Sequence, residues 1–241
     1  MSEQNPVVVL VHGAFAEAAS WNGVIAQLQD KGLQTVAVAN PLRSVAGDAA
    51  YVRDVIEGIG RPVVLVGHSY GGFVITEAAA GNGDVLGLVY VDAFAPDHGE
   101  NAFELSGKFP GSTLGEALDA YPVSTGGVEL VIRPELFHQQ FCADVPAGQA
   151  ALMAATQRPV TQTALTDALP TEKPAWTTIP SWFVISDADL NIPVALHRYF
   201  AERAGARGTH EVAGGSHALS VSQPAAVTAT ILAAVDGVSG R

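Results

Sequence analysis

The chain has 241 residues, of which 48% are hydrophobic and 15% are charged, so it can bury a large core in one α/β domain. Its 12 basic and 24 acidic residues give a net charge of −12, and no Lys/Arg cluster occurs, which argues against nucleic acid and membrane surfaces as partners. No apolar run reaches the roughly 18 residues that a membrane-spanning helix needs. The start of the chain lacks a basic signal-peptide region and Cys142 is the single cysteine, so we expect a cytoplasmic protein without an internal disulfide.

Runs of valine and leucine alternate with helix patterns over the first 91 residues. Continuous β-branched runs such as VVVLV are typical of strands that are buried on both faces of a parallel sheet. The expected strands cover 7–11, 35–39, 63–66 and 85–91, and the expected helices cover 20–31, 51–59 and 73–80. This order predicts a parallel sheet with helices on both faces.

This alternation stops after the fourth strand. Residues 94–178 show no clear buried strand, only loops with Pro and Gly and helix patterns at 114–121, 134–141 and 147–156. Such a stretch is too long for a loop in a compact domain, so we predict that it is a helical cap inserted in the core. Strands are expected again at 181–186 and 209–212, and helices at 193–204 and 225–235. The predicted fold is a mostly parallel sheet of six main strands, formed by residues 1–93 and 179–241, with the cap at 94–178.

One serine stands at a sharp turn between the third strand and the helix after it. Residues 63–73 read VVLVGHSYGGF, which matches the G-x-S-x-G pattern of a nucleophile elbow in its strand, turn and helix context. A serine at such an apex has a strained backbone, and Gly67 and Gly71 leave room for it. The sequence therefore indicates Ser69 as a nucleophile.

A serine hydroxyl needs a base, and the base needs an orienting carboxylate. In the elbow fold these partners follow in the order serine, acid, histidine, on loops after later strands. Among the seven histidines, His217 stands in a glycine-flanked loop after the last predicted strand, so we predict that it is the base. Asp189 and Asp187 follow the fifth strand and Asp92 follows the fourth. We favour Asp189 as the acid and keep Asp92 and Asp187 as alternatives.

The oxyanion that forms during acyl transfer needs backbone N–H donors. We expect one from Tyr70, at the start of the elbow helix, and one from Ala14 in the HGAF turn, with Phe15 as the alternative. Phe15, Phe94 and Trp176 are apolar candidates for the substrate pocket. No phosphate-binding loop with its lysine and no metal-ligand spacing occurs, so we expect neither a cofactor nor a metal.

Four motifs in this order resemble the α/β-hydrolase fold superfamily. They are VLVHGAF at 9–15, VGHSYGG at 66–72, DLNIP at 189–193 and GGSHA at 214–218. More narrowly, the chain is similar to small bacterial hydrolases related to plant methyl-ester esterases and hydroxynitrile lyases. The resemblance implies that the aspartate of the D-x-x-I-P segment, here Asp189, is the triad acid. The lyases carry a threonine where this chain has Gly13 and a lysine where it has Ala218, so the resemblance implies ester hydrolysis.

These motifs lead us to expect a serine hydrolase that cleaves a small, apolar carboxylic ester or lactone through an acyl-enzyme intermediate. Three alternatives stay open: a ligand-binding or receptor-like protein of the same fold with little turnover, a cofactor-free perhydrolase, and a C–C bond hydrolase. The expected partner is a small-molecule substrate. A homo-oligomer stays open as an alternative to a monomer.

Overall fold

One six-stranded parallel sheet organises the computed structural model, which describes residues 5–124 and 126–239. Its strands are β1 (Val7–Val11), β2 (Thr35–Val38), β3 (Val63–His68), β4 (Val85–Val91), β8 (Ser181–Ser186) and β9 (Gly208–Val212). They lie in the order β2-β1-β3-β4-β8-β9, and each neighbouring pair is parallel. The predicted parallel sheet is confirmed.

The central strands of this sheet are buried on both faces. Every residue of β1, β3 and β8 is buried, as their near-continuous apolar runs require. Valine dominates β1 and β3, and its branched side chain packs well on a pleated surface. The edge strands β2 and β9 are partly exposed. The buried strands therefore give a rigid support to the loops at their carboxyl ends.

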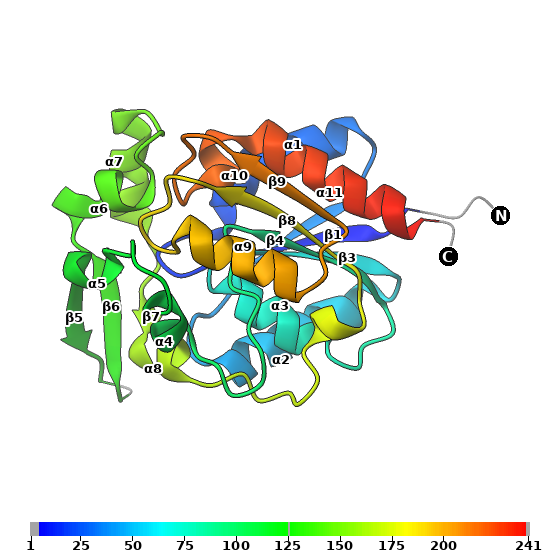
Figure 1. Cartoon of the computed structure of the whole chain (residues 1–241), viewed down its shortest axis with the longest axis horizontal. Coiled ribbons are helices and arrows are strands. Elements are labelled where there is room, and N and C mark those ends of the chain that lie inside the picture. Colours follow the sequence, from blue (N-terminus) through cyan, green and yellow to red (C-terminus); the bar gives the residue numbers. More distant parts are fainter. Residues whose placement is uncertain (1–4, 125, 240–241) are drawn as a thin grey trace.

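Helices cover both faces of the sheet (Figure 1). The helices α1 (Asn22–Asp30) and α11 (Pro224–Val238) pack on one face, and α2 (Val45–Ile59), α3 (Gly71–Ala79) and α9 (Val194–Arg203) lie on the other. Two short helices, η1 (Ala18–Trp21) and α10 (Leu219–Ser222), precede α1 and α11. A separate hydrophobic cluster fills each side of the sheet. Within the described ranges, no helix has the length and apolar character to span a bilayer.

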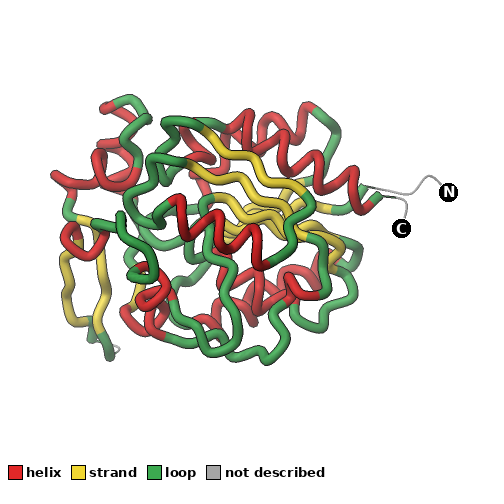
Figure 2. Tube along the Cα trace, viewed as in Figure 1, coloured by secondary structure: helices red, strands yellow, loops and turns green. Residues whose placement is uncertain are grey.

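The segment between β4 and β8 contains strands that we did not predict, beside the predicted helices (Figure 2). Its helices are α4 (Ala102–Ser106), α5 (Leu114–Ala117), α6 (Pro134–Phe141), α7 (Ala147–Thr156), α8 (Gln162–Thr166) and η2 (Ala175–Thr177). Its strands β5 (Leu118–Pro122), β6 (Val128–Ile132) and β7 (Val160–Thr161) form an antiparallel sheet. The helix predicted at 114–121 is wrong in its second half, because α5 ends at Ala117 and β5 follows. Most side chains of β5 and β6 are partly or fully exposed, so these strands lack the apolar run that marks a buried strand.

The helices α4 to α8 and the strands β5 to β7 of this segment lie beyond the carboxyl ends of the core strands (Figure 1). Phe137 and Phe141 belong to the same buried hydrophobic cluster as Phe73 of α3. The Thr161 N–H donates to the Leu42 carbonyl oxygen at 3.1 Å. The cap thus packs directly over the loops in which the predicted catalytic residues lie. The division into core residues 1–93 and 179–241 and cap residues 94–178 stays a prediction.

Candidate active site

Ser69 stands at the turn between β3 and α3 with a left-handed backbone angle φ of 54°. A residue with a side chain rarely adopts this angle, which carries a strain of about 1–3 kcal/mol. A Cβ atom at Gly67 would lie 2.7 Å from the Gly71 carbonyl oxygen, and one at Gly72 would lie 1.9 Å from the Phe94 carbonyl oxygen. Only glycine fits at these two positions, so the turn has the tight, strained geometry of a nucleophile elbow.

The turn after β1 lies directly against this elbow. A Cβ atom at Gly13 would lie 2.6 Å from the Ser69 Cβ and 2.7 Å from the His68 carbonyl oxygen. Hydrogen bonds hold this turn: Asn40 Nδ2–H donates to the His12 carbonyl oxygen, and His12 Nδ1–H donates to the Gly13 carbonyl oxygen, both at 2.9 Å. Burial lowers the pKa of His12 to about 4, so its ring is neutral at physiological pH. The two turns are therefore fixed relative to each other.

Two backbone N–H groups beside Ser69 are free to bind an oxyanion. In the part of the chain that the structure describes, the N–H groups of Ala14 and Tyr70 donate no hydrogen bond. The Phe15 N–H instead donates to the carbonyl oxygen of Arg158 in the cap, at 3.2 Å. The geometry thus favours Ala14 and Tyr70 as the donor pair over the alternative Phe15.

His217 lies between β9 and α10, and its side chain is buried. Its Nδ1–H donates to Asp189 Oδ2 at 2.6 Å. The neighbouring His68 Nε2–H donates to the His217 carbonyl oxygen at 2.9 Å and so braces this loop. Burial lowers the pKa of His68 to about 3, so this brace carries no charge at physiological pH. The structure brings the predicted base and the favoured acid together.

The Asp189 carboxylate accepts four N–H groups. Its Oδ2 accepts from the rings of His217 and His197, at 2.6 and 3.0 Å. Its Oδ1 accepts from the backbone of Asn191 and Ile192, at 2.7 and 3.0 Å. Burial alone raises the pKa of this carboxyl, but the electrostatic attraction of His217 and the hydrogen bonds from His197 and His217 outweigh burial and hold the pKa well below its usual range. Asp189 is therefore ionised at neutral pH and can orient the base.

The two alternative acids have other contacts. Asp92 stands at the end of β4 with a φ of 40°, and its Oδ1 accepts the Ser186 N–H at 2.7 Å. Asp187 is exposed, and its Oδ1 accepts the Gly214 N–H at 2.6 Å. Among the described side chains, neither carboxyl contacts His217. The geometry favours Asp189 as the partner of His217.

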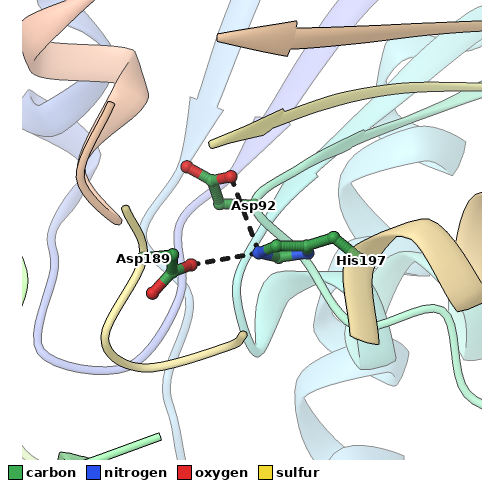
Figure 3. Close-up of side chains that lie close together, drawn as sticks. All are labelled: Asp92, Asp189 and His197. Atoms are coloured by element: carbon green, nitrogen blue, oxygen red, sulfur yellow. Dashed lines mark hydrogen bonds and ion pairs between the residues drawn. The ribbon is translucent and has the colours of Figure 1, made fainter. Parts of the chain in front are cut away.

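Sequence reasoning missed His197, which projects from α9 between Asp189 and Asp92 (Figure 3). The available signal was its position on the buried face of α9, directly after the DLNIP segment. The three side chains place one possible metal-ligand atom each within 4.8 Å of one another. The Asp189 oxygen in this cluster already accepts two N–H groups, so hydrogen bonds use the lone pairs that a cation would need.

A cavity of about 870 Å³ lies between the core and the cap. It is lined by six of the residues predicted for the site: Ala14, Phe15, Ser69, Tyr70, Phe94 and His217. Most of its cap side is formed by apolar side chains, among them Leu114, Leu118, Leu130 and Leu165. The volume lies in the usual range of small-molecule sites, roughly 300–1,000 Å³. The predicted nucleophile, base, oxyanion donors and two pocket residues therefore share one cavity.

Trp176 is not among the residues that line this cavity, and its place in the substrate pocket stays a prediction. Its indole N–H donates to the Pro96 carbonyl oxygen at 2.8 Å, and the Arg203 guanidinium lies 5.4 Å from its ring. A large amphipathic ring can serve a packing role as well as a pocket, and its sequence position alone does not distinguish the two.

The comparison with known families fits this geometry. Residues 8–230 match the sequence model of the Alpha/beta hydrolase family. The chain belongs to this family. It is therefore a hydrolase, and the predicted family membership is confirmed.

Named relatives of this α/β hydrolase include plant and fungal proteins. The alpha/beta hydrolase nvfD of Aspergillus novofumigatus is 28% identical over 221 residues, which cover 82% of this chain and 84% of the relative. Esterase PIR7B of Oryza sativa subsp. japonica is 27% identical over 243 residues, which cover 90% of each chain. Among solved structures, polyneuridine aldehyde esterase has the same fold, with a TM-score of 0.81 at 21% identity over 95% of this chain and 99% of that chain.

Proposed function

We propose that this protein is a serine esterase that cleaves an uncharged carboxylic ester or lactone through an acyl-enzyme intermediate. The observation that carries the proposal is the cavity that Ser69 and His217 share, with His217 Nδ1 held 2.6 Å from Asp189. A nucleophile, a base oriented by a buried carboxylate and an open volume for an acyl group are what acyl transfer needs. The rice relative, which is named an esterase, supports the same reaction class.

The first half of the reaction transfers the acyl group to the enzyme. Ser69 Oγ attacks the ester carbonyl carbon while its proton passes to His217 Nε2. The carbonyl oxygen becomes an oxyanion, which the N–H groups of Ala14 and Tyr70 bind. The bond to the alcohol oxygen then breaks, and His217 returns the proton to that oxygen. Asp189 stabilises the imidazolium during both steps and fixes the proton of the neutral ring on Nδ1.

The second half frees the enzyme. A water molecule takes the place of the alcohol and gives a proton to His217 as it attacks the acyl carbon. The oxyanion forms again in the same donor pair, and the Ser69 oxygen leaves with the proton from His217. The products are one carboxylic acid and one alcohol, or a hydroxy acid from a lactone.

The cavity supports a larger ester than the small one that the sequence suggested. Its volume of about 870 Å³ exceeds what an acetate ester fills, and its lining is mainly apolar. Glu104 is the one Asp, Glu, Lys or Arg side chain among the described residues that line it. A single carboxylate there, together with the net charge of −12, disfavours anionic substrates. We therefore propose an ester with a bulky, uncharged acyl or alcohol part.

The test is activity and active-site labelling. Wild-type protein should hydrolyse p-nitrophenyl esters and react with a fluorophosphonate probe at Ser69, and Ser69→Ala should lose both, with kcat lower by at least about 1,000-fold. The matched control is Ser106→Ala, a second serine in the same cavity whose hydroxyl donates to the Ala102 carbonyl oxygen. This variant should still be labelled.

Three results would contradict the proposal. Unchanged turnover in Ser69→Ala would place the reaction at another residue. Tight binding of the ester by wild-type protein without turnover would favour the ligand-binding alternative. Activity with peroxide or with a diketone, and none with esters, would favour the perhydrolase or the C–C bond hydrolase.

A further inference from the structure

The carboxylate that faces His217 has a second, buried set of neighbours behind it (Figure 3). Asp189 follows β8, Asp92 stands at the end of β4, and His197 lies on the buried face of α9. All three side chains are completely buried. His197 Nε2 lies 3.0 Å from Asp189 Oδ2 and 3.6 Å from Asp92 Oδ1. The proposed steps of ester hydrolysis use Asp189 and leave the other two without a role.

The contacts of His197 fix where its proton lies. Its Nε2 is within hydrogen-bond distance of a carboxylate oxygen, which can only accept, so the proton is on Nε2. Its Nδ1 is buried and has no partner among residues 5–124 and 126–239. An imidazolium would leave a second N–H group without a partner in this buried site, which is costly. His197 is therefore neutral, with its single proton directed at the carboxylates.

The contacts of Asp92 point to a neutral carboxyl. Its Oδ1 accepts one N–H, from Ser186, and its Oδ2 has no partner within the described part of the chain. Burial raises the pKa of Asp92 well above its usual range, and the charges of Asp189 and of Asp144 in the cap add to the rise. Two neighbouring carboxyls that are both completely buried do not both ionise readily. The negative charge stays on Asp189, which accepts four N–H groups.

We propose that His197 is a positioning residue: it holds the ionised Oδ2 of Asp189 toward His217. Asp92, which lies next to His197, is neutral and adds no second buried charge. When His217 gains a proton during acyl transfer, Asp189 is then the one buried carboxylate that pairs with it. Without His197, one side of Asp189 Oδ2 has no N–H donor, and the carboxylate can turn away from the base. The activity readout of this inference rests on the proposed esterase function.

The decisive variants are His197→Gln and His197→Met, because these side chains have similar lengths and only glutamine carries an N–H donor. His197→Met should lower kcat by about 10- to 100-fold with KM nearly unchanged. The acid limb of its kcat/KM profile should move to higher pH, because a carboxylate with one donor fewer holds the His217 proton more firmly. His197→Gln should recover most of kcat and the wild-type limb. The other titratable groups that face this site, His68, Asp92 and Asp144, are the same in both variants.

His210→Met is the matched control, since His210 is exposed on β9 and is not among the residues that line the cavity. It should keep wild-type kcat. A folded His197→Met protein with wild-type kcat and acid limb would overturn the inference. A Gln variant as slow as the Met variant would also overturn it, because packing and not the N–H donor would then matter.

Nitrogen NMR of the histidine rings in wild-type protein tests the same inference without any variant. His197 should show a protonated Nε2 and an unprotonated Nδ1 at neutral pH. A proton on Nδ1 would overturn the inference even if the variants do not fold. Failure of the esterase proposal is distinguishable, because the wild-type protein itself would then not react with a fluorophosphonate.

Discussion

The carboxyl ends of β4 and β8 each place a buried aspartate against His197, yet the two carboxyls are in different states. Asp189, after β8, accepts four N–H groups, and its pKa lies well below the usual range. Asp92, at the end of β4, accepts one N–H group, and its pKa lies well above the usual range. The number of N–H donors around each carboxyl, and not the position after a strand, decides which aspartate carries the charge.

The backbone explains this difference in donors. The chain after Asp189 folds back, so that the N–H groups of Asn191 and Ile192 point at its carboxylate. Asp92 is itself in the left-handed region, and its own N–H donates to the Val184 carbonyl oxygen at 3.0 Å. The chain then leaves the sheet for the cap and supplies no N–H group to the Asp92 carboxyl. Only one of the two strand ends is built to hold an anion.

The largest expected effect separates the two aspartates by activity. Asp189→Asn should lower kcat by about 10,000-fold, because the amide cannot fix the His217 tautomer or stabilise the imidazolium. Asp92→Asn should lower kcat by less than about tenfold, because asparagine resembles a neutral carboxyl and can still accept the Ser186 N–H. Steady-state kinetics with one p-nitrophenyl ester measures both. The reverse order of the two losses would move the triad acid to the end of β4.

A smaller effect is expected from the cap residue that braces the Asp189 loop. Gln140 is buried; its Nε2–H groups donate to the Leu190 carbonyl oxygen and to Asn191 Oδ1, and its Oε1 accepts from Thr113. Gln140→Ala leaves these groups unpaired and should lower the free energy of unfolding by about 1–3 kcal/mol. Because the loosened loop carries Asp189, kcat should fall by about tenfold. The contacts of Asp92 should stay unchanged.

Chemical denaturation and kinetics of Gln140→Ala test this link. Gln139→Ala, its less buried neighbour on α6, is the control and should keep the wild-type unfolding midpoint. A normal kcat in Gln140→Ala would mean that the Asp189 loop keeps its geometry without the cap.

The smallest effect concerns stability as a function of pH. Asp92 has a raised pKa in the folded state, so above the pKa of the unfolded chain, about 3.9, its burial lowers stability. Asp92→Asn removes this penalty and should raise Tm by about 2–4 °C at neutral pH, with the gain vanishing as the pH falls below about 4. Asp189 has a lowered pKa and contributes stability that is present above that pH and lost as the pH falls. Asp189→Asn should therefore lower Tm at neutral pH; a Tm loss in both variants would contradict the neutral state of Asp92.

The sequence was sufficient for the parts of this site that depend on local geometry. Ser69 stands in a short glycine-containing turn after a strand with a continuous apolar run, and His217 stands in a glycine-flanked loop after the last predicted strand; both signals are visible in the residue order. The choice among Asp189, Asp92 and Asp187 depended partly on the family resemblance, because donors from other parts of the chain decide it. His197 was missed because a buried histidine on a helix has the same pattern whether it packs or binds a carboxylate.

The cap was predicted less completely for a related physical reason. The helices α6 and α7 were found at their correct positions, whereas β5 and β6 have mixed exposure and no buried run. Strands of this kind are stabilised by cross-strand pairing, which residue periodicity shows weakly. Trp176 was assigned to the pocket on its apolar character alone, and its packing against Arg203 could not be read from the sequence.

The hydrogen bond from the Phe15 N–H to the Arg158 carbonyl oxygen ties the turn that carries Ala14 to the cap. The cavity lies between that cap and the core, so this hydrogen bond joins its two walls next to Ser69. The Ala14 N–H, which is proposed to bind the oxyanion, directly precedes the N–H group that the cap holds. The cap therefore helps to place the oxyanion donor as well as to shape the substrate cavity.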